Sequence, residues 1–220
     1  MRRETDRQLY VYALSAPGFP RRLAVRGRTL RAMSIGKVDV IVGRPPPPDR
    51  TVEAVQRQHR IVGELAARTS SLLPARFGSA IDEDALRSLV SERQDELRAA
   101  LTRVRHCQQM TIRVFGAIEH DAVPLAPPMS GADYLARRRE RALHEPPDVA
   151  VIRRALAGVV KAERVEPGER GIRVTVYHLV AARRLAEYRR RASALQSLPT
   201  ASAVTVTGPW PPFAFAPELF

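Results

Sequence analysis

The second half of the chain alternates between two hydrophobic periods in an order that few folds accommodate. Residues 110–115 and 172–180 are rich in β-branched side chains, and in 172–180 apolar residues recur at every second position, which is the period of a strand. Residues 149–161 and 183–198 repeat apolar side chains at three- and four-residue steps, which is the period of an amphipathic helix. Two shorter strands are expected at residues 162–166 and 203–207. This order predicts an antiparallel sheet with both helices on one face, the split βαβ or ferredoxin-like plan.

The first half of the chain predicts a small sheet followed by helices. Short apolar runs punctuated by Gly and Pro indicate three strands, at residues 9–14, 30–35 and 38–42. Four prolines at residues 45–48 then provide a stiff connector, because proline has no amide donor and its φ is fixed.

Beyond residue 51 the hydrophobic period becomes that of a helix, which is expected to end near residue 69. A second helix is expected from Asp82, whose carboxylate can cap free amides, to residue 104, with Arg93 interrupting its apolar stripe. The inward stripe of the first helix is predicted at Val52, Val55, His59, Val62 and Ala66.

Together the two halves predict an α+β protein of two domains, residues 1–106 and 107–220. The N-terminal domain has a small sheet with two helices, and the C-terminal domain is ferredoxin-like. Between the first strand and first helix of the second domain, residues 119–147 are too long for a plain connection. An extra Arg-rich helical insertion is therefore expected near residues 127–147.

The net charge of +13 at first suggests a polyanionic partner. All but two of the 36 basic residues are Arg, the exceptions being Lys37 and Lys161, and the chain has no Asn. Because Lys and Asn have A-rich codons, this bias indicates a GC-rich genome rather than selection for phosphate binding. We therefore expect no specific nucleic-acid partner, and interpret Arg137–Arg141 and Arg189–Arg191 as exposed helix faces that lack the aromatic platforms of RNA-binding sheets.

A single cysteine, Cys107, excludes an intrachain disulfide and a Cys-based zinc site and fits a reducing cytoplasm. Residues 192–217 contain no ionisable side chain, but five prolines interrupt them, so no membrane span is expected.

Sequence motifs for common enzyme chemistry are missing. The chain has no Gly-rich phosphate loop, no Gly-x-Ser-x-Gly elbow and no His-Glu-x-x-His pair. His106 and Cys107 are neighbours entering a strand and so point to opposite faces, while His178 lies on an apolar strand face, as a core histidine does. Glu119-His120-Asp121 is expected in a solvated loop. The sequence therefore predicts no catalytic residue, no cofactor and no metal site.

Three segments carry a more specific pattern. The helix with His59 is followed by Leu73-Pro74-Ala75-Arg76-Phe77-Gly78-Ser79. Near its C-terminus the chain contains Thr207-Gly208-Pro209-Trp210-Pro211-Pro212-Phe213-Ala214-Phe215, and its middle contains Ser130-Gly131-Ala132-Asp133-Tyr134-Leu135. In order and spacing these resemble the Leu-Pro-x-Arg-Phe-Gly-Thr, Thr-Gly-Pro-Trp-Pro-Pro-Tyr-x-Phe and Gly-x-x-Tyr-Leu motifs of the gas vesicle protein F/L family (GvpF/GvpL). The departures are Ser79 for Thr, Phe213 for Tyr, and neutral Gln109 where the family usually has an acidic residue.

The resemblance implies a non-enzymatic accessory or minor structural protein of gas vesicles, located in the cytoplasm with the vesicles. Its expected partner is the apolar shell protein GvpA, with other gas vesicle proteins, and its expected role is to prevent shell-protein aggregation and support assembly. The alternative is a basic RNA- or ribosome-associated protein on a ferredoxin-like sheet. The residues implied for signature or partner-binding roles are His59, Pro74, Arg76, Phe77, Gly78, Tyr134, Gly208, Pro209, Trp210, Pro211, Pro212 and Phe213.

Two of these residues leave alternatives open. Arg76, in an otherwise apolar turn, is expected to be half-buried and to bind backbone carbonyls or an acid such as Glu53 or Asp84. Trp210, between prolines, either packs over the C-terminal sheet or stays exposed as an anchor for a partner.

Overall fold

Two antiparallel sheets, one of six strands and one of four, organise the chain in a mixed α/β architecture. The computed structural model describes residues 8–44, 50–116, 146–169, 171–197 and 203–219. The chain separates into two units, each with its own sheet: unit 1 is residues 1–108 with 210–220, and unit 2 is residues 109–209.

The C-terminal residues group with unit 1. The predicted division keeps residues 107–220 together, whereas in the structure residues 210–220 lie in unit 1. The physical reason is that Phe213 packs against the hydrophobic core of unit 1, beside residues such as Ile61 and Leu72.

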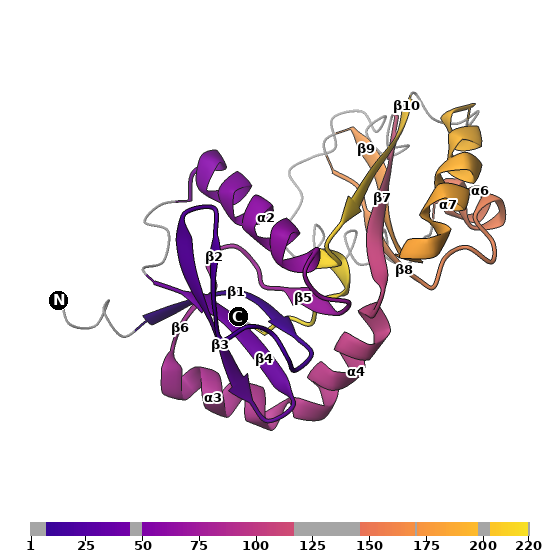
Figure 1. Cartoon of the computed structure of the whole chain (residues 1–220). Coiled ribbons are helices and arrows are strands. Elements are labelled where there is room, and N and C mark those ends of the chain that lie inside the picture. Colours follow the sequence, from indigo (N-terminus) through magenta and orange to yellow (C-terminus); the bar gives the residue numbers. More distant parts are fainter. Residues whose placement is uncertain (1–7, 45–49, 117–145, 170, 198–202, 220) are drawn as a thin grey trace, which may run out of the picture. The chain divides into compact units, whose positions relative to one another are not determined.

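The sheet of unit 1 has the strand order β2-β3-β4-β1-β5, and β6 also pairs with β1 (Figure 1). Strand β1 is buried from Leu9 to Ser15, because β4 pairs with one of its edges and β5 and β6 share the other. The three predicted strands correspond to β1, β3 and β4. The strands β2, β5 and β6 are so short that no hydrophobic period can be recognised in their sequences. The bounds are β1 Gln8–Ser15, β2 Arg22–Val25, β3 Arg28–Ile35, β4 Val38–Gly43, β5 Leu72–Pro74 and β6 Ala80–Asp82.

The helices α2, Val52–Ala66, and α3, Glu83–Glu92, begin at side-chain caps. The hydroxyl of Thr51 accepts a hydrogen bond from the Ala54 amide at 3.1 Å, and the Asp82 carboxylate accepts one from the Asp84 amide at 2.9 Å. Arg93, at φ −107° and ψ 22°, leaves the helical conformation and divides the predicted second helix into two. The bounds are α2 Val52–Ala66, α3 Glu83–Glu92 and α4 Gln94–Val104.

Helix α2 buries a different face from the one predicted. Val52 and Val55, expected to point inward, are 73% and 45% exposed. The predicted stripe is therefore wrong at Val52 and Val55, because the stripe with the larger side chains packs against the sheet. Val62 is buried as predicted, Ala66 packs partly buried against the core, and His59 is half-buried. The buried residues of α2 are Gln58, Ile61, Val62 and Leu65.

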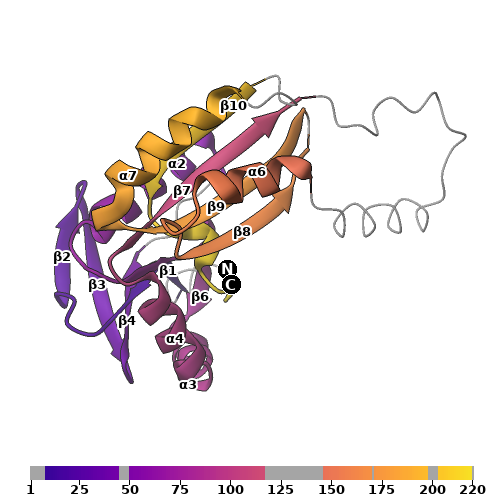
Figure 2. The ribbon, with the colours of Figure 1, turned by 90° about the vertical axis from the view of Figure 1, so that its right-hand side faces the viewer.

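The sheet of unit 2 has the strand order β10-β7-β9-β8, and two helices, α6 and α7, cover one face of it (Figure 2). In β9 the predicted inward residues Val174, Val176 and His178 are buried, but Thr175 and Leu179 are buried as well, so burial does not alternate along the strand. The expected insertion near residues 127–147, with Tyr134, lies outside the described residues except for its last two positions. The bounds are β7 Cys107–Phe115, α6 Pro147–Ala155, β8 Ala162–Pro167, β9 Ile172–Ala181, α7 Leu185–Ala192 and β10 Ala203–Trp210.

Candidate functional site

Three of the predicted site residues meet in unit 1 as an aromatic cluster, formed by His59, Trp210 and Phe213. The centre of the His59 ring lies 5.2 Å from that of Trp210, with the planes at 65°, an edge-to-face contact. It lies 5.5 Å from the centre of the Phe213 ring, with the planes at 17°, a stacked contact. The helix of the first signature and the C-terminal ending thus lie side by side (Figure 1).

Prolines position the C-terminal part of this cluster. Pro211 and Pro212 are buried, and a short 3₁₀ turn, Phe213–Phe215, follows them. Because proline fixes φ, the chain between the two aromatic residues has little freedom, and Phe213 enters the core while Trp210 keeps 37% of its surface exposed. The ring contact of Trp210 is with α2 of unit 1, whereas the first expectation was packing over the C-terminal sheet, and the side chain remains partly exposed. Its role as an anchor for a partner stays a prediction.

Gly208 and Pro209 precede the cluster at the end of β10. Gly208 has φ +119°, a region that favours glycine, and a Cβ there would lie 2.7 Å from the Gln109 carbonyl oxygen. The peptide bond between Gly208 and Pro209 is cis, and Pro209 is exposed.

The first signature forms a turn between β5 and β6. Pro74 is buried in β5, Phe77 is half-buried, and Gly78 adopts φ +89°. Ser79 closes the turn, because its hydroxyl donates to the Arg76 carbonyl at 2.8 Å. Glycine at position 78 therefore follows from the left-handed backbone of this turn.

Two buried side chains that the sequence did not single out fix this turn to α2. The Tyr10 hydroxyl donates to the Gln58 side-chain oxygen and accepts from the Gly78 amide at 2.9 Å. The Gln58 side-chain nitrogen donates to the Ala75 carbonyl at 3.2 Å. Burial raises the pKa of Tyr10, so its hydroxyl stays protonated as a donor. The only sequence signal for Gln58 is its spacing of three and seven residues from Ile61 and Leu65.

Arg76 is placed differently from the expectation. Its side chain is 64% exposed and pairs with Glu218, not with Glu53 or Asp84. Arg93 donates to the Glu218 carbonyl oxygen at 2.8 Å. The correction has a simple cause: residues 210–220 lie in unit 1, which brings a carboxylate from the end of the chain to the turn.

The residues considered for other chemistry lie at the start of β7 or outside the described ranges. The Cys107 thiol donates to the Arg105 carbonyl at 3.2 Å, and His106 adopts φ +54°. Within the described ranges, no group of three or more His, Cys, Asp or Glu side chains is arranged to hold a metal ion. Glu119-His120-Asp121 lies outside those ranges.

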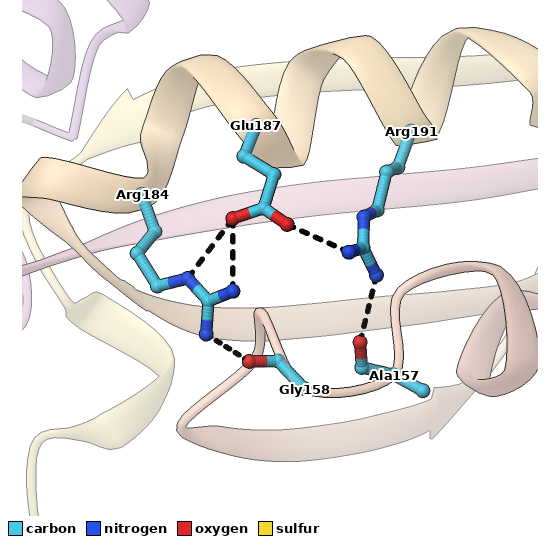
Figure 3. Close-up of polar contacts among 5 residues, drawn as sticks. All are labelled: Ala157, Gly158, Arg184, Glu187 and Arg191. Carbon is cyan, nitrogen blue, oxygen red and sulfur yellow. Dashed lines mark hydrogen bonds and ion pairs between the residues drawn. The ribbon is translucent and has the colours of Figure 1, made fainter.

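Arg191 of α7 and Arg184, which directly precedes this helix, tie it to the loop after α6 (Figure 3). Glu187 accepts from Arg184 at 2.8 Å and from Arg191 at 2.7 Å. Arg191 also donates to the Ala157 carbonyl at 2.9 Å, and Arg184 donates to that of Gly158. The hydrogen bond from Arg184 lowers the pKa of Glu187, which remains a carboxylate. At least two arginines of this region therefore have a structural role.

A helix that crosses a bilayer needs about 20 consecutive, predominantly apolar residues, and this requirement applies to each of the described helices. None of them is both long and apolar enough to cross a membrane.

Comparisons with known proteins agree with the arrangement of these motifs. The family model described as gas vesicle synthesis protein GvpL/GvpF matches residues 8–217. Among solved structures, the chain is similar to the crystal structure of gas vesicle protein GvpF from Microcystis aeruginosa, with 13% identity, a TM-score of 0.69, and coverage of 96% of this chain and 99% of that chain. It is also similar to GvpF from Anabaena sp. PCC7120, with 12% identity, a TM-score of 0.67, and coverage of 96% and 98%.

No match was found among curated protein sequences. At such low identity the structural likeness shows the fold, whereas the family match spans both units and includes the turn at Arg76 and the ending at Trp210. The chain therefore belongs to the gas vesicle synthesis protein GvpL/GvpF family, and its role lies with gas vesicles.

Proposed function

We propose that this protein binds the apolar shell protein of the gas vesicle, GvpA, prevents its aggregation before assembly, and supports vesicle growth in the cytoplasm. One observation carries the proposal beyond family membership. Of the four large hydrophobic side chains that are exposed in the described part of the chain, three lie on α2 or against it, namely Val52, Val55 and Trp210. Exposed apolar side chains gathered on one element favour an interaction site there.

The physical reason for such a partner is the chemistry of a gas-filled shell. A subunit that faces gas needs a large apolar surface, which drives aggregation in water before assembly. A partner that covers several hundred Å² of this surface gains several kcal/mol, at roughly 25 cal/mol per Å², before association costs. The net charge of +13 on the covering protein would keep the complex dispersed.

We infer that unit 2 is a ferredoxin-like domain, which is supported by the strand order β10-β7-β9-β8, with α6 between β7 and β8 and α7 between β9 and β10. We also infer that the role of the protein is non-enzymatic, which the match to the gas vesicle family supports. The alternative of an RNA-associated protein on this sheet is not favoured, because the family match points to gas vesicles.

The first experiment removes this protein from cells that make gas vesicles from the cognate gene cluster. We expect fewer or no vesicles with unchanged synthesis of the shell protein, and recovery when the gene is returned. A normal vesicle yield, in a strain with no second family member, would contradict the proposal.

The second experiment tests binding directly, by co-expressing the shell protein with this protein and measuring the shell protein in the supernatant after centrifugation. We expect co-purification and a larger fraction in the supernatant. If the shell protein sediments equally with and without this protein, the aggregation-preventing role is wrong.

A further inference from the structure

We propose that the two-helix layer of unit 2 is a docking surface for an acidic segment of another polypeptide. The four residues that would bind it are Arg154, Arg183, Arg189 and Arg190, which we call the arginine face. Arg154 lies on α6, Arg183 in the short 3₁₀ turn before α7, and the other two on α7. The inference does not depend on binding of the shell protein, because it concerns a different surface and a different chemistry.

The core of unit 2 turns the arginine face outward. Arg154 lies two positions from each of the buried residues Ile152 and Leu156. Arg190 lies in the same way two positions from the buried Tyr188. In a helix with 3.6 residues per turn, side chains two positions apart point to opposite sides. All four arginines are exposed, and Figure 2 shows α6 and α7 on the same face of the sheet.

The acidic residues of this layer already have cationic partners. Helices α6 and α7, with the 3₁₀ turn before α7, contain only two, Asp148 and Glu187. The side chain of Asp148 is fully buried and pairs with Arg173 at 3.3 Å. Glu187 is within four positions of three members of the arginine face, but its two oxygens already accept from Arg184 and Arg191 (Figure 3).

The carboxylate of Glu163, on the neighbouring strand β8, is also engaged. It bonds to Arg153 at 2.7 Å and to His178 at 3.0 Å. Within the described ranges, no ion pair joins an acidic side chain to any of the four arginines of the face. The layer therefore carries positive charge that no described carboxylate offsets, and a carboxylate-rich partner would be attracted to it.

Genomic bias does not account for this distribution of charge. A preference for Arg over Lys changes the type of cation along the whole chain, yet α2, α3 and α4 each carry at least as many acidic as basic residues. The helix dipole favours the arginines in the last turn of α7, but it disfavours a cation at Arg183, two positions before the first residue of that helix. Arg183 thus occupies a place that the stability of α7 alone does not explain.

The side chains between the arginines select the class of partner. Single-stranded nucleic acid needs aromatic side chains on which bases stack, and a bilayer surface needs large apolar side chains that enter it. The exposed neighbours of the arginines are small, as Ala150 and Ala186 are, and Val151 is the only large exposed apolar side chain on the described α6 and α7. Carboxylates require neither feature, because each guanidinium can bind two carboxylate oxygens. The occupant is therefore an acidic polypeptide segment.

The test measures binding of the full-length protein to labelled poly-L-glutamate by fluorescence anisotropy at physiological ionic strength. In the triple variant Arg183→Gln/Arg189→Gln/Arg190→Gln, the dissociation constant should rise about tenfold or more, because three of the four cations are lost. The melting temperature should not fall, because none of these side chains contacts the core.

A matched control separates the arginine face from net charge. Arg21→Gln/Arg22→Gln/Arg60→Gln removes three exposed arginines from unit 1, so the net charge falls equally. Its dissociation constant should change less than about twofold. Equal weakening in the two triple variants would mean that poly-L-glutamate responds only to net charge, and would overturn the proposal.

The single variant Arg183→Gln gives a second, independent readout. Removing a cation near the N-terminus of α7 should leave the melting temperature equal to that of wild type or higher, while binding weakens several-fold. A lower melting temperature with unchanged binding would show that Arg183 has a structural role and does not bind the acidic segment.

Two further probes decide the class of partner. Single-stranded poly-U RNA and vesicles containing phosphatidylglycerol should bind more weakly than poly-L-glutamate. If either binds more tightly and loses its binding in the first triple variant, the arginine face serves that partner and the assignment to an acidic polypeptide is wrong. Failure of wild type to bind poly-L-glutamate would also contradict the proposal. Shell-protein binding is measured separately, so none of these results bears on the proposed function.

Discussion

Nδ1 of His178 lies 2.8 Å from the hydroxyl oxygen of Tyr188, and both side chains are fully buried in unit 2. Nε2 of the same imidazole lies 3.0 Å from one carboxylate oxygen of Glu163. The other oxygen of this carboxylate accepts a hydrogen bond from Arg153 at 2.7 Å. Because a carboxylate only accepts hydrogen bonds, Nε2 carries a proton. Burial lowers the pKa of His178, so the ring is neutral and Nδ1 accepts from Tyr188. The core histidine expected at position 178 is thus a neutral side chain with both nitrogens bonded.

The free energy of unfolding should depend on the ionisation of His178. Burial lowers the pKa of His178 below its ordinary value of 6.5, and the raising effect of Glu163 only partly offsets it. The unfolded chain therefore takes up the proton first as pH falls. Stability from this group should be fully present above about pH 6.5 and decrease as pH drops toward the lowered pKa.

Urea unfolding from pH 5 to pH 8 checks this expectation. In His178→Gln, which has no imidazole to ionise, the fall in stability below pH 6.5 should be smaller than in wild type. Identical pH profiles for the two proteins would show that His178 does not contribute.

Removing the Tyr10 hydroxyl should destabilise unit 1. Tyr10→Phe leaves the Gln58 side-chain oxygen and the Gly78 amide without their partner in a buried setting, which costs about 1–3 kcal/mol. Tyr177→Phe is the control, because that hydroxyl bonds to Glu166 at a less buried position, and it should cost less. Equal losses in chemical denaturation would contradict the role of the Tyr10 network.

The Arg76 ion pair should contribute little to stability, although Arg76 belongs to the family signature. Both partners are exposed, at 64% for Arg76 and 66% for Glu218, where solvent screens the pair. A double-mutant cycle with Arg76→Ala and Glu218→Ala should give a coupling energy below about 1 kcal/mol. A coupling of several kcal/mol would mean that the pair is protected from solvent.

Adding a methyl group to Gly208 should be far more costly than adding one to Gly158. Both have positive φ, at +119° and +75°, but the Gly208 Cβ would also approach the Gln109 carbonyl oxygen to 2.7 Å, while that of Gly158 meets no atom of the described residues within 4 Å. We expect Gly158→Ala to cost about 1 kcal/mol and Gly208→Ala more than that, because backbone has to shift. Similar melting temperatures for the two variants would argue against the close approach.

The sequence by itself determined the order of the elements and the family. The strands at residues 9–14, 30–35 and 38–42 were predictable because short apolar runs bounded by Gly and Pro are a local signal, and so was the strand–helix order of the second half. The turn at Arg76 and the ending at Trp210 identified the family because their residue types and spacing are themselves the signal.

Only the tertiary structure decided which side chains meet. Two apolar stripes compete on α2, one through Val55 and one through Ile61, and a local period does not state which of them the sheet covers. The partner of Arg76 stands 142 positions away, at Glu218, because the chain returns to unit 1 after completing unit 2. Such pairs depend on the path of the whole chain rather than on any fixed spacing, so no local pattern encodes them.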